Sequence, residues 1–183
     1  MTGGRVLRRR SFRGLALFVL AFFGGGAALP VAAALSSGEA GPMFGAAVIL
    51  GLGSLAYRVT RSRVHIGETS LTVVNPLFSH EVPYGAIRRI EGNRAGSLIV
   101  LPKDGAADTE GSGYLVVGFA GSLLDRKFKT SDKAAAELKK RRHKGRHLPG
   151  ADGPVRRKLA GDVVAETLLL AATVCAVASV TLR

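Results

Sequence analysis

The chain has 183 residues, a hydrophobic content of 47% and a formal net charge of +13. This length leaves room for one modest domain and a few additional helices. Soluble proteins this basic usually bind nucleic acid, but here long uncharged runs alternate with dense clusters of lysine and arginine, a pattern typical of membrane proteins. The single cysteine, Cys175, excludes an intramolecular disulfide and a cysteine-based zinc site.

Three apolar runs predict membrane-spanning helices. Residues 15–35 form an uncharged run of about 21 residues, which at 1.5 Å per residue is enough for a hydrocarbon core of roughly 30 Å. Residues 42–57 form a shorter run of about 16 residues behind a polar hinge. These two runs predict a helical hairpin within residues 15–59. The third run, residues 163–182, is again about 20 residues long.

Two acidic residues lie at the start of the third run. Asp162 and Glu166 occupy what would be the first turn of its helix, where a carboxylate meets the positive end of the helix dipole. We interpret both as structural residues at the membrane interface. The alternative is that Glu166 faces a partner helix or a polar cavity, because acidic residues within membranes are costly and often functional.

The basic residues predict an orientation. Lysine and arginine precede the first run, follow the second and precede the third, whereas the loop between the first two runs has neither. Because basic flanks stay in the cytoplasm, we expect a multi-pass protein of the cell membrane with its N-terminus and central region in the cytoplasm and its C-terminus outside. Residues 9–12 also resemble a twin-arginine export signal, but cleavage after Ala34 would leave the central region cytoplasmic.

The central region has the pattern of a small β-rich domain. Turn residues at 67–70 and a polar loop at 103–113 separate short runs of β-type residues. The expected strands are residues 64–66, 71–74, 79–83, 87–90, 97–101 and 114–119. Ser131 and Asp132 then predict the start of a helix that continues to residue 142. Several strands followed by one helix favour a small barrel or half-barrel that is closed by the helix.

Parts of this region resemble a known family. Residues 64–66, residues 71–75, Phe78, residues 82–84 and Ile87 are similar to the signature of pleckstrin-homology-like (PH-like) domains of actinobacteria, of the low-molecular-weight protein antigen 6 type, and residues 131–138 are similar to the closing helix of that family. The resemblance implies a non-catalytic module joined to membrane helices. Its PH-like core would include Val73, Val82, Pro83, Tyr84 and Ile87.

Departures from the family pattern weigh against a ligand inferred from the resemblance. Glu81 stands where a basic residue is common. Tyr84 replaces the tryptophan that is usual in the family, and the turn at residues 67–70 contains Glu68 but no basic residue. Readers of inositol lipids place lysine and arginine around the corresponding turn. Inositol-lipid binding is therefore not implied.

The sequence contains no pattern that predicts catalytic residues, a cofactor site or a metal site. His143 and His147 have a spacing that suits a metal on a helix, but the surrounding cations would oppose it. These cations form a basic tract: Lys139, Lys140, Arg141, Arg142, Lys144 and Arg146. Our leading interpretation is contact with anionic lipids of the inner leaflet. A topology signal or a docking surface for a protein partner is the alternative, and nucleic acid is disfavoured because no aromatic residues are interleaved for base stacking.

Together these features predict an α+β membrane protein with three transmembrane helices and one PH-like domain. The expected segments are a basic N-terminus (residues 1–14), a helical hairpin (15–59), the PH-like domain (60–143), a basic linker (144–158) and a third transmembrane helix (159–183). We expect a non-enzymatic scaffold that binds a membrane-protein partner or anionic lipid headgroups. The alternative is an accessory or structural subunit of a transporter or membrane enzyme.

Overall fold

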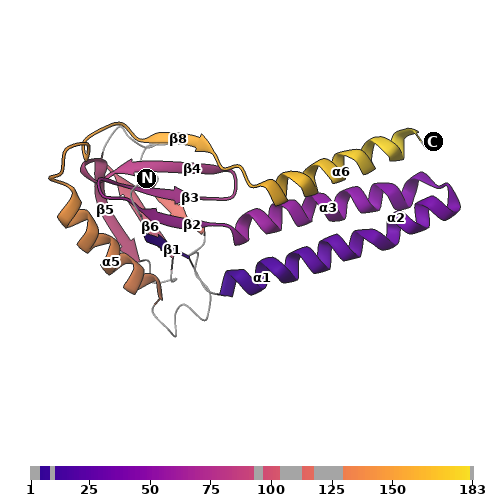
Figure 1. The fold of residues 1–183 in the computed structure, drawn as a ribbon, viewed down its shortest axis with the longest axis horizontal. Coiled ribbons are helices and arrows are strands. Elements are labelled where there is room, and N and C mark those ends of the chain that lie inside the picture. Colours follow the sequence, from indigo (N-terminus) through magenta and orange to yellow (C-terminus); the bar gives the residue numbers. More distant parts are fainter. Residues whose placement is uncertain (1–4, 9–10, 93–96, 104–112, 118–129, 182–183) are drawn as a thin grey trace. The chain divides into compact units, whose positions relative to one another are not determined.

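The computed structural model describes residues 5–8, 11–92, 97–103, 113–117 and 130–181, which form two compact units (Figure 1). The β unit comprises Met1–Arg9 and Ser62–Ala160. The helical unit comprises Arg10–Arg61 and Gly161–Arg183. Each unit is therefore built from segments that are distant in the sequence.

The helical unit contains three helices that are long and apolar enough to cross a membrane, as the sequence predicted. The first, Ser11–Ser37, is continuous but changes its winding in the middle, where a π-helical turn, η1 (Leu20–Gly24), lies between α1 (Ser11–Val19) and α2 (Gly25–Ser37). Gly38 ends α2 in a left-handed conformation with φ of 72°, which glycine adopts without steric cost. The other two helices are α3 (Ala40–Thr60) and α6 (Val163–Thr181).

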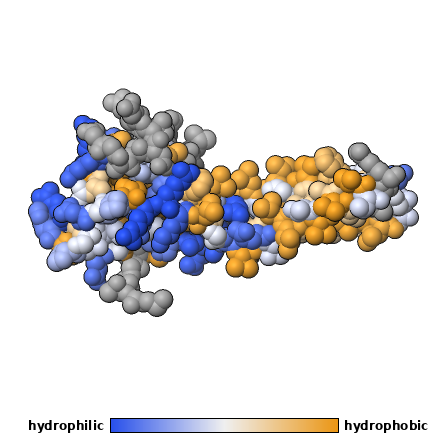
Figure 2. Space-filling view, turned by 90° about the horizontal axis from the view of Figure 1, so that it is seen from above, coloured by the Kyte–Doolittle hydropathy of each residue, from blue (hydrophilic) through white to orange (hydrophobic). Residues whose placement is uncertain are grey.

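Small residues allow α3 to pack closely against the helices on either side of it. A β-carbon added at Gly53 would lie only 2.6 Å from the β-carbon of Phe23, so glycine is needed at this crossing. Leu50 of α3 is buried together with Ala27 of α2 and Ala172 of α6. The outward surface of the unit is mostly apolar (Figure 2). Its exposed side chains include Leu17, Phe18, Phe22, Leu29, Leu52 and Leu170.

The β unit contains two antiparallel sheets. The five-stranded sheet has the strand order β1 (Arg5–Leu7), β2 (Arg63–Ile66), β3 (Ser70–Val74), β4 (Phe78–Pro83) and β8 (Arg156–Leu159). The three-stranded sheet has the order β5 (Ile87–Gly92), β6 (Leu98–Pro102) and β7 (Tyr114–Val116). A short 3-10 turn, η2 (Tyr84–Ala86), joins β4 to β5.

The hydrophobic core lies between these sheets and the helix α5 (Thr130–Gly145). Residues of β2, β3 and β6 alternate between buried and half-buried, as strands with one face on a core should. Leu138 of α5 is fully buried in the same cluster. All of the expected PH-like core residues are buried: Val73, Val82, Pro83, Tyr84 and Ile87.

Asn75 connects the two sheets at the turn between β3 and β4. Its side-chain amide donates a hydrogen bond to the carbonyl oxygen of Leu115 (2.8 Å) and accepts one from the backbone N–H of Val117 (3.1 Å). The side chain thus pairs with the end of β7 much as a strand would. Asn75, the last residue of the segment 71–75 that resembles the family signature, thus has a structural role here.

The structure differs from the sequence prediction in three respects. Strands β1 and β8 were not expected, and β8 begins within the segment that was interpreted as a basic linker and ends one residue beyond it. A barrel is not confirmed, because the described strands form two separate sheets and no closed barrel. Most of the predicted loop at residues 103–113 and the end of the predicted strand at 114–119 lie outside the described residues.

Candidate functional site

The five-stranded sheet has two ends with different neighbours along the chain. At one end, which we call the link end, Leu7 pairs with Val64 and Phe78 pairs with Leu159. The strand residues nearest to the boundaries between the units, Leu7, Arg63 and Leu159, all lie at this end. At the other end, the turn end, lie the β2–β3 turn at residues 67–69 and the buried ring of Tyr84.

The C-terminal part of α5, which carries the basic tract, is anchored at the turn end. A β-carbon at Gly145 would lie 2.6 Å from the ring of Tyr84 and closer still to the carbonyl oxygen of Glu68. The Tyr84 hydroxyl in turn donates a hydrogen bond to the carbonyl oxygen of Gly67 (2.9 Å). Burial raises the pKa of Tyr84 above its usual value, so this hydroxyl stays protonated and able to donate.

Arg142 belongs to the fold rather than to the free surface of the tract. Its Nη2 donates a hydrogen bond of 2.6 Å to the carbonyl oxygen of Ile87, the first residue of β5. Burial, together with the neighbouring Arg146, lowers the pKa of Arg142 from its usual high value. An arginine remains charged under these conditions, and its hydrogen bond fixes the last turns of α5 to the start of β5.

The other five basic residues of the tract are exposed to solvent: Lys139, Lys140, Arg141, Lys144 and Arg146. Positions seven and eleven residues apart on a helix share a face, so Lys140 and Lys144 align with Lys133 on the outward side of α5. Glu137 offsets part of this charge through an ion pair with Arg141 (3.5 Å). Arg146 Nε donates a hydrogen bond to Nε2 of His147 (2.8 Å), which occupies one of the two ring nitrogens that could bind a metal.

The length of the sheet separates this surface from the link end. Five steps along β4, from Phe78 to Pro83, cover about 17 Å at 3.3 Å per residue. This exceeds the Debye length of about 8–10 Å at physiological ionic strength. Charges at the end of α5 and charges at the link end therefore act as two separate electrostatic surfaces.

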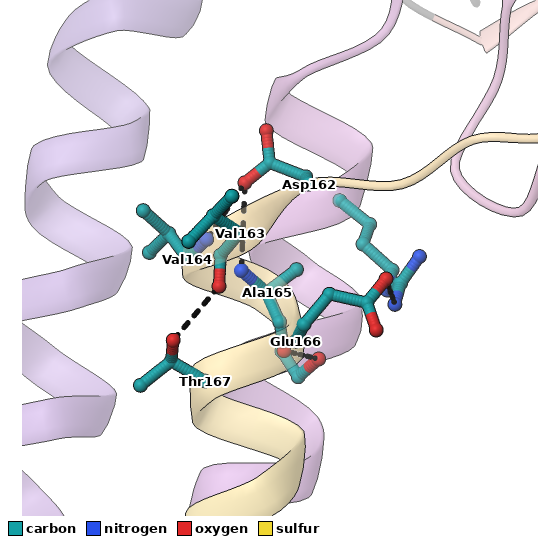
Figure 3. A network of polar contacts seen from close by, with 8 residues as sticks. Asp162, Val163, Val164, Ala165, Glu166 and Thr167 are labelled. Atoms are coloured by element: carbon teal, nitrogen blue, oxygen red, sulfur yellow. Dashed lines mark hydrogen bonds and ion pairs between the residues drawn. The ribbon is translucent and has the colours of Figure 1, made fainter.

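A polar network connects α3 with the start of α6 in the helical unit (Figure 3). Asp162 precedes α6, and its Oδ1 accepts hydrogen bonds from the backbone N–H groups of Val164 (3.2 Å) and Ala165 (3.4 Å). Its Oδ2 accepts one from Nε of Arg61 (2.7 Å). Asp162 thus caps the positive end of the α6 dipole and binds α3 at the same time.

Glu166 forms the second ion pair between these helices. Its Oε1 lies 3.1 Å from Nη2 of Arg58, and the buried hydroxyl of Ser54 donates a hydrogen bond of 2.7 Å to the carbonyl oxygen of Ala165. The sequence had offered a structural interfacial role for Glu166 or a position facing a partner helix, and in the structure Glu166 is paired with a helix of its own unit. Arg58 and Arg61 are among the basic residues that follow the second apolar run, and the sequence pattern related those residues only to membrane orientation.

The described residues contain no group of three or more His, Cys, Asp or Glu side chains that could hold a metal ion. His80 is buried and stacks against Tyr114 with ring centroids 4.4 Å apart, so it packs within the β unit. Nε2 of His65 accepts a hydrogen bond from Nε of Arg63 (2.7 Å). Burial and the charge of Arg63 lower the pKa of His65 below 6.5.

Comparison with known proteins identifies one part of the chain. The comparisons found no matching curated protein and no matching solved structure for the chain. Residues 61–118, which contain β2 to β7, match the bacterial PH domain family, whereas α5 and β8 lie outside the match. This match supports a bacterial PH-like domain in the β unit.

Proposed function

We propose that this chain is a non-enzymatic, multi-pass membrane protein whose PH-like domain is a binding module, and that the exposed basic residues of α5 bind an acidic segment of a protein partner. Three features support the proposal: a match to a family whose domains are in general non-catalytic, three helices of sufficient length and apolarity, and a dense cluster of exposed cations. The lysine and arginine distribution favours the cytoplasmic side for this module.

We choose a protein partner over lipid because the basic tract lies at the turn end of the sheet. Gly145 and Arg142 attach the end of α5 about one strand length from the link end, where the chain enters the apolar helices. Attraction to an anionic leaflet decays within a Debye length. An acidic protein segment can reach this surface from solution in any orientation of the β unit, whereas lipids of the leaflet reach it only if the unit lies against the membrane, so we favour the protein segment.

Binding can be tested on the full-length chain in nanodiscs of neutral lipid. The probe is a fluorescent peptide of ten alternating Asp and Glu residues, and a parallel arm uses vesicles that contain phosphatidylglycerol. The test variant replaces Lys139, Lys140, Arg141 and Lys144 by Gln and retains Arg142. The control variant removes the same number of exposed charges elsewhere, at Arg88, Arg89, Arg156 and Lys158.

We expect the peptide to bind more weakly as salt rises. The test variant should bind it at least about fourfold more weakly than the wild type, since four exposed charge pairs contribute about 0.2–1 kcal/mol each. The control variant should retain most of the binding. If both variants lost peptide affinity equally, the net charge of the chain alone would explain the binding, and the proposal would be contradicted. If the tract bound anionic vesicles in preference to the peptide, its ligand would be anionic lipid rather than an acidic protein segment.

A further inference from the structure

The link end of the β unit exposes two large apolar side chains. Leu77, in the turn between β3 and β4, is 53% exposed, and Leu159, the last residue of β8, is 79% exposed. The backbone N–H of Ala160 donates a hydrogen bond of 2.9 Å to the carbonyl oxygen of Leu77, so the two segments are joined there. Two exposed leucines that are 82 positions apart in the sequence thus lie at the same end of the sheet.

Positively charged side chains lie beside the two leucines at the link end. The guanidinium of Arg157 lies 3.6 Å from the ring centroid of Phe78, and Lys158 is exposed beside Ser79. Glu81 is the one acidic residue of β4 and β8. It lies opposite Arg156 in the strand register, toward the turn end. The link end therefore combines exposed leucines with positive charge, a composition suited to the interface of an anionic membrane.

The chain itself limits how far this surface can be from the bilayer. Three residues, 160–162, separate the end of β8 from the start of α6. Four Cα-to-Cα steps from Leu159 to Val163 reach at most about 14 Å even when the chain is fully extended. A surface held this close to a transmembrane helix is within reach of the headgroup layer.

We propose that the link end lies in the headgroup layer of the membrane that the three helices span, with Leu77 and Leu159 as apolar anchors and Lys158 as a contact to lipid phosphate. The β3–β4 turn then becomes a second, non-helical point of membrane contact. This inference requires the helices to be membrane spans but is independent of any partner of α5.

The test uses the full-length chain in nanodiscs that contain phosphatidylglycerol, with Cys175 replaced by Ser. Single cysteines at position 77, 148 or 170 carry a small environment-sensitive fluorophore. Leu148 is an exposed leucine that follows α5 at the turn end, and Leu170 is an exposed leucine of α6. Lipids with a nitroxide near the headgroup, lipids with a nitroxide deep in the acyl chain for position 170, and aqueous iodide are the quenchers.

We expect the headgroup nitroxide lipid to quench the Leu77→Cys label at least twofold more than the Leu148→Cys label, and iodide to show the reverse order. Lys158→Gln should reduce the lipid quenching at position 77 without changing it at position 148. Equal quenching at positions 77 and 148 while the Leu170→Cys label is lipid-quenched would overturn the inference. Lack of lipid quenching at position 170 would overturn both this inference and the assignment of α6 as a membrane span. The binding of acidic peptide to α5 is measured separately.

Discussion

Replacement of Gly145 by Ala tests whether α5 ends at the turn end of the sheet. In a solvent-exposed helix this change would stabilise the fold by about 1 kcal/mol, because alanine is the better helix former. Here the new methyl group would lie 2.6 Å from the Tyr84 ring and closer to a backbone carbonyl that cannot rotate away. Overpacking of this kind costs about 1–3 kcal/mol, and with backbone involved we take about 2–3 kcal/mol. The net expectation is a destabilisation of about 1–2 kcal/mol.

Two measurements check the expected effect of Gly145→Ala. Urea denaturation of a fragment containing residues 62–160, followed by tyrosine fluorescence, gives the change in the free energy of unfolding. Hydrogen exchange on the full-length chain should show faster exchange in the last turns of α5 and at residues 67–70. Gly153→Ala is the control, because its β-carbon would lie at an ordinary 3.7 Å from Pro83. A Gly145→Ala fragment as stable as the wild type would refute the anchoring of α5 at the turn end.

Three further outcomes follow from the structure. The pKa of His65 is lower in the folded β unit than in the unfolded chain, so the unfolded state binds the proton more readily. The free energy of unfolding should therefore fall as pH drops below about 6.5. Unfolding measured between pH 7.5 and 5.5 should show a weaker pH dependence in His65→Gln. Asn75→Ala removes two hydrogen bonds between the sheets and should cost about 1–2 kcal/mol in urea denaturation; a change near zero would show that water replaces them. A reporter active only in the cytoplasm should work when inserted within residues 104–113 and stay silent after Arg183, and the opposite pattern would contradict the predicted orientation.

Local patterns of the sequence carried most of the secondary structure. Apolar runs near the length of a bilayer predicted the three long helices, because such a run satisfies its backbone hydrogen bonds within itself. Alternating residues predicted β2 and β3, since one face of each strand packs on the core. The resemblance to PH-like domains rested on the same core positions, and the family match covers them.

Strands β1 and β8 could not be read from the sequence. All four residues of β8 are exposed, and three of them are basic, so no apolar alternation marks it. An edge strand is held by hydrogen bonds to its neighbour, here β4, and charged side chains at an edge discourage pairing with other chains. Its existence therefore depends on a partner strand 75–81 residues earlier in the chain.

The candidate surfaces were decided by tertiary contacts for the same reason. The sequence located the basic tract, but the contact of Gly145 with Tyr84 places its end at the turn end, and the hydrogen bond to Ile87 separates Arg142 from the exposed cations. Likewise, the sequence showed acids at the start of the third apolar run and arginines at the end of the second, while only the packed helices pair them, across 108 residues for Arg58 and Glu166. Composition determines which charges and apolar runs a chain has, whereas long-range packing determines which of them meet and which remain exposed.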